Sequence, residues 1–143
     1  MRAWWALMMA CAGSWACLSR CAEDRAGSDV QIERLRAAAV RARGEQVYRQ
    51  SCALCHGENG DGRGPRSMGL DRRPANFTDP IWSRPDGASR AYHAITDGVP
   101  GTAMPAWRAV FSEDDRWALV AFITGVSERG AAGGPAATTT LER

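Results

Sequence analysis

The sequence predicts an all-α fold of three to four helices. The segments with a clear hydrophobic period follow helical spacing, and the clearest of them, at residues 113–124, carries apolar side chains three and four positions apart. The thirty residues at positions 57–86 are instead rich in Gly, Pro, Asp and Asn, which favours a loop. A loop of this length is unusual inside a compact domain. We therefore expect it to wrap a rigid group that replaces part of the core.

The first 22 residues have the pattern of an export signal or a lipoprotein signal. An uncharged stretch at 3–19, rich in Trp, Leu, Met and Ala, follows an N-terminal arginine. The tetrapeptide that ends at Cys21 resembles the lipobox of bacterial lipoproteins, although Arg20 occupies a position where a small residue is usual. Three outcomes remain open: lipidation of Cys21, ordinary cleavage beside it, or an uncleaved anchor at the short limit of a bilayer span.

Residues 23–43 predict a partly helical spacer, and packing of this segment against the domain is the alternative. The domain is expected at 44–127, followed by a flexible tail rich in Ala, Gly and Thr at 128–143. Its first helix places Val47 and Tyr48 on one face, three and four residues after Gly44. Glycine inside a helix costs about 1 kcal/mol, so we expect a second helix to approach closely there.

The pentapeptide Cys52-Ala53-Leu54-Cys55-His56 is the attachment motif of haem c. Each thiol adds to one vinyl group of the porphyrin, and one helical turn separates the two sulfur atoms suitably. The imidazole of His56 then supplies one axial bond to the iron. A structural zinc site would need a second pair of ligands that does not follow the motif, and a thioredoxin-like dithiol would need a preceding strand.

Two further helices are predicted after the loop. One covers residues 88–96, with Asp86 as its cap, and the other begins after Ser112 with three acidic residues in its first turn. Gly125 is expected to end the last helix. Between them, Met104 lies on a turn rich in Gly and Pro, which indicates that its side chain is presented from a loop.

These elements, in this order from residue 44 to residue 125, resemble the class I cytochromes c, the small bacterial monohaem cytochromes. The resemblance implies a class I fold wrapped around one covalently bound haem c, held by Cys52 and Cys55, with His56 and Met104 as the axial ligands of the iron. It also implies that the first and last helices cross at a contact between glycine and an aromatic residue, for which Trp117 is the candidate.

The same resemblance suggests Pro65 as the carbonyl acceptor for Nδ1 of the haem histidine, with an ordinary turn proline as the alternative. Trp82 is expected to cover an edge of the haem. His93 and Met68 are weaker candidates for the sixth ligand. The propionates need cationic partners, and the sequence does not choose among Arg63, Arg66, Arg72, Arg73 and Arg84.

Charge and composition exclude some classes of partner. All eighteen basic residues are arginine, and no charge run indicates nucleic acid or an electrostatic membrane surface. If protein side chains occupy both axial positions of the iron, its remaining chemistry is the exchange of one electron. We therefore expect a one-electron carrier between redox protein partners in the bacterial envelope, and not an enzyme. A haem subunit docked permanently to a larger oxidoreductase is the alternative. The expected location is periplasmic, with a membrane tether through Cys21 or an uncleaved helix left open.

Overall fold

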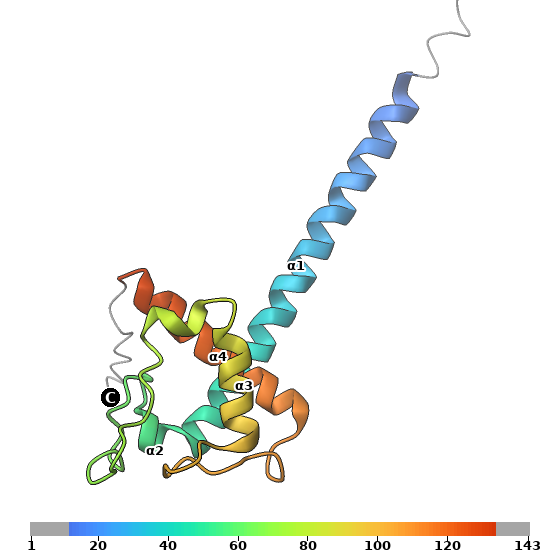
Figure 1. Ribbon diagram of the computed structural model, residues 1–143. Helices are drawn as coiled ribbons and strands as arrows, with labels where there is room; N and C mark the ends of the chain where they lie inside the picture. Colours follow the sequence, from blue (N-terminus) through green and yellow to red (C-terminus); the bar gives the residue numbers. More distant parts are fainter. Residues whose placement is uncertain (1–11, 134–143) are drawn as a thin grey trace, which may run out of the picture. The chain divides into compact units, whose positions relative to one another are not determined.

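The computed structural model describes residues 12–133, and in this part of the chain it contains helices and no strand. The elements are α1 (Ala12–Ser51), α2 (Ala53–His56), the short 3₁₀ helix η1 (Pro80–Ser83), α3 (Gly87–Asp97) and α4 (Glu113–Ala131), as Figure 1 shows. The prediction of an all-α fold is thus confirmed.

Helix α1 is continuous across the predicted boundary between spacer and domain at residue 44. The chain divides into two units, one up to Ala38 and one from Ala39 onward, and the side chains at positions 29–38 are exposed. Residues 1–11 of the predicted signal lie outside the described part of the chain, and residues 12–22 belong to the start of α1. None of the helices in the described part is both long enough and apolar enough to cross a bilayer. The predicted domain limits at residues 22, 43 and 127 stay predictions.

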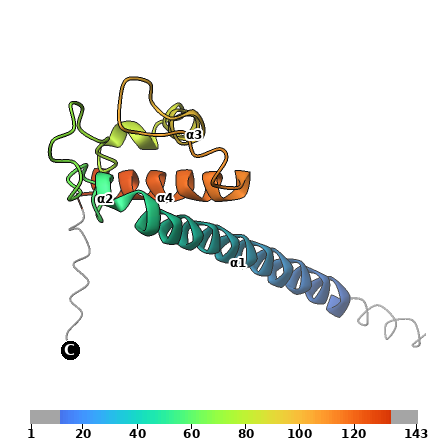
Figure 2. The ribbon, with the colours of Figure 1, turned by 90° about the horizontal axis from the view of Figure 1, so that it is seen from below.

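The close approach predicted at Gly44 is present, but its partner differs from the predicted one. A Cβ atom on Gly44 would lie only 1.9 Å from the carbonyl oxygen of Ala118 in α4. The ring of Phe122, one turn further along α4, lies 4.9 Å from that of Tyr48. Trp117 instead stacks on Tyr92 of α3 at 4.2 Å and is 45% exposed. Figure 2 shows α4 beside the C-terminal part of α1.

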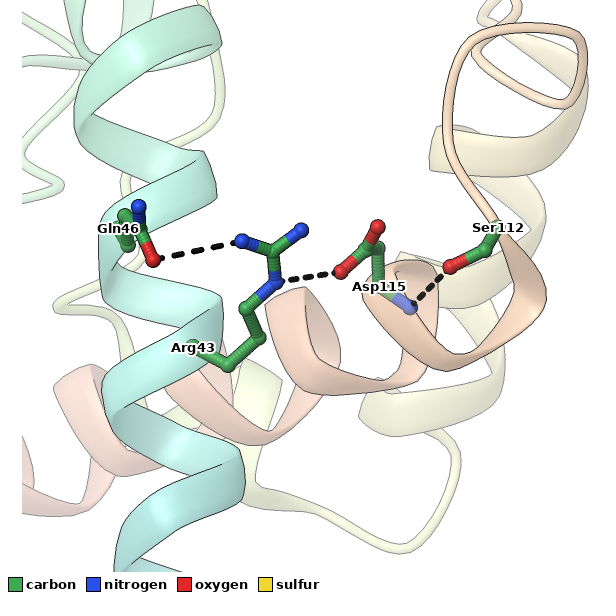
Figure 3. A network of polar contacts seen from close by, with 4 residues as sticks. All are labelled: Arg43, Gln46, Ser112 and Asp115. Atoms are coloured by element: carbon green, nitrogen blue, oxygen red, sulfur yellow. Dashed lines mark hydrogen bonds and ion pairs between the residues drawn. The ribbon is translucent and has the colours of Figure 1, made fainter.

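A polar network joins the same two helices at the N-terminus of α4 (Figure 3). Arg43 Nε donates to Asp115 Oδ1 at 2.7 Å, and its Nη1 donates to Gln46 Oε1 at 3.3 Å. The hydrogen bond from Arg43 lowers the pKa of Asp115, while the same bond raises the pKa of Arg43. The backbone N–H of Asp115 donates to Ser112 Oγ at 3.1 Å, which confirms Ser112 as the N-cap.

The prediction that α4 ends at Gly125 is wrong, because the helix continues to Ala131. Contacts with the loop before η1 stabilise the additional turns. Ser127 is fully buried and its hydroxyl donates to the carbonyl of Asp79 at 2.6 Å. A Cβ atom on Gly130 would lie 2.4 Å from the carbonyl oxygen of Thr78, so helix and loop pack closely there.

Helix α3 matches its predicted range within one residue at each end. Asp86 occupies the N-cap position, as expected, but its side chain makes no capping hydrogen bond. Two of the buried residues of α3, Ala91 and Ile95, join a core that also contains Tyr48 and Leu119. This core forms one side of the candidate site.

Candidate haem-binding site

The four residues predicted to hold haem line one cavity of about 330 Å³. Cys52, Cys55 and His56 come from the junction of α1 and α2, and Met104 comes from the loop between α3 and α4. They are far apart in the sequence, so the fold itself brings the methionine to the motif. Most of the other lining side chains are apolar or aromatic, among them Leu70, Phe77, Trp82, Ala91, Ala94, Ile95, Val99, Trp107 and Ile123.

The motif forms a single helical turn. Cys52 is the N-cap of α2, and the N–H of His56 donates to its carbonyl at 2.9 Å. The following loop folds back over this turn, because the N–H groups of Gly62 and Gly64 donate to the carbonyls of His56 and Cys55 at 2.8 and 3.1 Å. The carbonyl groups at the end of the helix are thereby satisfied without water.

The imidazole of His56 is held by one hydrogen bond and one stacked ring. Nδ1 lies 3.1 Å from the carbonyl oxygen of Ala75, and the ring stacks on Phe77 with centroids 4.6 Å apart. A carbonyl oxygen can only accept, so Nδ1 carries the proton and Nε2 keeps its lone pair. Burial lowers the pKa of His56, and the bond to Ala75 offsets this only in part. The side chain is therefore a neutral imidazole, the form that ligates a metal.

The prediction that Pro65 accepts the bond from His56 is wrong, since Ala75 accepts it. The acceptor lies nineteen positions after the histidine, where the loop returns across the motif. No role was predicted for Phe77, which lies in the loop expected at 57–86. A backbone carbonyl acceptor cannot be predicted from the side-chain pattern, because every residue has a backbone carbonyl group.

Cys52 and Cys55 are not joined in a disulfide. Burial raises the pKa of the Cys52 thiol to about 12, and the neighbouring Cys55 adds to the effect. An unattached thiol at this position would thus be protonated at neutral pH. A thioether has no ionisable proton, so attachment to a vinyl group would be compatible with this buried position.

The weaker ligand candidates do not lie in the cavity. His93 has 70% of its side chain exposed, with Nδ1 3.8 Å from Asp97 Oδ2, and Met68 is 86% exposed. Trp82 does line the cavity, as predicted for a residue that covers a haem edge, and its Nε1 donates to the carbonyl of Asn76 at 2.9 Å.

Two of the five arginines that were candidates for the propionates are among the residues that line the cavity. These are Arg72 and Arg73, which are adjacent in the loop. Neither Arg63, Arg66 nor Arg84 is part of the lining.

The donor set fits haem c. Two thiols one helical turn apart, a neutral imidazole, a thioether and apolar walls meet at one cavity. Its volume falls within the range of about 300–1,000 Å³ that is usual for cofactor pockets. A zinc site is a poor alternative, because within residues 12–133 no three His, Cys, Asp or Glu side chains are grouped so that they could hold a metal ion.

Residues 39–123 match the model of the family described as cytochrome c oxidase, cbb3-type, subunit III. The chain belongs to this cytochrome c family. The match covers more than half of the chain and includes the motif, the loop and the Met104 segment. It confirms the predicted resemblance to cytochromes c at the level of the family.

Three relatives illustrate the similarity. The cbb3-type cytochrome c oxidase subunit CcoP of Cereibacter sphaeroides is 33% identical over 89 residues, which are 62% of this chain and 28% of CcoP. Cytochrome c55X of Paracoccus denitrificans is 37% identical over 75 residues, 50% of this chain and 60% of the relative. A chain of the Kuenenia stuttgartiensis reducing HAO-like protein complex Kustc0457/Kustc0458 is 34% identical with a TM-score of 0.52, covering 61% of this chain and 42% of that one. The chain thus spans under two thirds of each relative.

Proposed function

We propose that this cytochrome is a monohaem, one-electron carrier of the bacterial cell envelope, with His56 and Met104 as the axial ligands of a single haem c. The observation that carries the proposal is the meeting of Cys52, Cys55, His56 and Met104 at one cavity. The bound haem iron would supply exchange between Fe(II) and Fe(III). The chain contains one CxxCH motif, which supports a single haem.

The residues of the chain have distinct tasks in this proposal. Cys52 and Cys55 would hold the porphyrin covalently, and the bond from His56 to Ala75 orients the imidazole and raises its basicity. A thioether as second axial ligand favours the reduced iron and raises its potential relative to two histidines. With both axial positions taken by protein, small substrates would have no place on the iron, so we propose a carrier without catalytic activity of its own.

The second candidate function is a haem subunit docked permanently to a larger oxidoreductase. The names of two relatives favour it, since one is a subunit of a cbb3-type oxidase and the other belongs to an HAO-like complex. Both functions use the same iron ligation and differ in the partner. Purification from envelope fractions under mild conditions separates them, because a docked subunit comigrates with its partner in a fixed ratio whereas a carrier purifies alone.

Spectroscopy of the exported holoprotein tests the ligation. Met104→Ala should keep the covalent haem, lose the weak near-infrared band of ferric methionine ligation, lower the reduction potential and gain carbon monoxide binding in the reduced form. His93→Ala is the matched control and should change none of these, because His93 lies outside the cavity. If the effects followed His93→Ala instead, the ligation proposed for the iron would be wrong.

A further inference from the structure

The loop that carries Met104 is closed by a small set of hydrogen bonds. The carbonyl of Met104 accepts from the N–H of Val99 at 3.1 Å, and its N–H donates to Thr102 Oγ1 at 3.1 Å. Both backbone polar groups of the methionine are therefore bound within the loop. The two ends of the loop lie close together, since a Cβ atom on Gly98 would lie 2.8 Å from the Met104 carbonyl oxygen.

Thr102 is the side chain that completes this closure. Its hydroxyl donates to the carbonyl of Val99 at 2.7 Å while it accepts from the Met104 N–H, so one oxygen joins both ends of the turn. Pro100 and Pro105 have no N–H to contribute alternative bonds within the loop. Loss of the hydroxyl would leave the partly buried Met104 N–H without its partner, and an unmade bond of this kind favours the open loop.

We propose that Thr102 is a positioning residue that keeps the Met104 thioether on the haem iron. It acts through the backbone of the methionine, and it sets the fraction of molecules in which the loop opens and the sixth position becomes free. This inference rests on the proposed ligation by Met104 and adds the group that controls how readily that ligand leaves.

Cyanide binding to the oxidised holoprotein measures the open fraction, because an external ligand binds only when the methionine has left and its apparent affinity scales with that fraction. Thr102→Val removes the hydroxyl with little change of shape, and we expect the apparent cyanide affinity to rise about two- to tenfold, the range set by one net hydrogen bond. Thr102→Ser keeps the hydroxyl and should stay within about twofold of the wild type.

Thr78→Val is the matched control. Its hydroxyl donates to Asn76 Oδ1 at 2.7 Å, and Thr78 is not part of the cavity lining, so cyanide affinity should not change. If Thr102→Val does not accumulate as holoprotein, Thr102→Ala replaces it in the same measurement.

The near-infrared band separates the possible failures. If the wild type shows the band and both Thr102→Val and Thr102→Ala bind cyanide as the wild type does, the role of Thr102 is refuted while ligation by Met104 stands. The same conclusion follows if Thr102→Ser behaves like Thr102→Val, since serine keeps the hydroxyl and the effect would then not follow that group. If the wild type lacks the band, the proposed ligation by Met104 is refuted, and the inference on Thr102 is refuted with it.

Discussion

Substitution of Gly44 by alanine should destabilise the holoprotein, because the two long helices of the domain meet backbone to backbone at this residue. The added Cβ would lie 1.9 Å from the carbonyl oxygen and 2.5 Å from the carbonyl carbon of Ala118, and 3.0 Å from Cβ of Phe122. Two of these contacts are with backbone atoms, which cannot rotate away. The helices must therefore separate, and the packing between Tyr48 and Phe122 loosens with them.

The magnitude follows from two opposing terms. Overpacking of a tight contact costs about 1–3 kcal/mol, and an overlap of this size belongs at the upper end. Alanine gains about 1 kcal/mol over glycine in helix propensity. We expect a net loss of about 2 kcal/mol in the free energy of unfolding, or a fall in Tm of about 8–16 °C for a domain of this size.

Gly125→Ala is the matched control, since Gly125 lies inside α4. The atoms nearest to a Cβ there belong to the Arg129 side chain at 3.5 Å and the Arg41 side chain at 3.9 Å, which are ordinary contact distances. This variant should gain up to about 1 kcal/mol. Guanidinium unfolding of holoproteins with equal haem content, followed by circular dichroism, compares the variants. If Gly44→Ala unfolds at the same denaturant concentration as the wild type, the reasoning about the helix crossing is refuted.

Three further predictions concern attachment, charge and the membrane. Replacing Cys52 and Cys55 together with alanine should abolish stable holoprotein in the envelope, and a folded, protease-resistant domain without haem would contradict this. Because Asp115 has a lowered pKa, its bond with Arg43 stabilises the fold above about pH 4 and is lost as the pH falls through the folded-state pKa. Asp115→Asn should therefore lower stability in urea at pH 7 but not at pH 2; an equal loss at both would count against the ion pair. If Cys21 is lipidated, Cys21→Ser should release the protein from membranes on fractionation, whereas a wild type already soluble would exclude the tether.

The candidate haem ligands could be chosen from the sequence because the chemistry of haem attachment fixes local spacing. Two thiols and an imidazole within one helical turn form a motif that is readable without any knowledge of the fold. Met104 could be placed on a loop by its flanking glycine and proline residues. The structure brings all four residues to one cavity, while their roles at the iron await the spectroscopic test.

The sequence did not determine which face of α4 packs against α1. Its apolar arc is broad, so neighbouring positions on the helix compete for the contact at Gly44. Trp117 was the larger aromatic residue, but Ala118 and Phe122 face α1, because only a small residue permits approach of the backbones at the crossing itself. The end of α4 was missed for a related reason, since Ser127 and its bond to the loop stabilise turns that Gly125 would otherwise disfavour.

The loop at 57–86 could be predicted from its length and composition, but its contacts could not. Backbone hydrogen bonds from Gly62 and Gly64 hold it to the motif, and Phe77 is its one buried apolar side chain. Other apolar side chains of the loop, such as Leu70 and Trp82, line the cavity. A loop with so little core of its own depends on what fills that cavity, which is why removal of both attachment thiols should unfold the domain and not merely empty it.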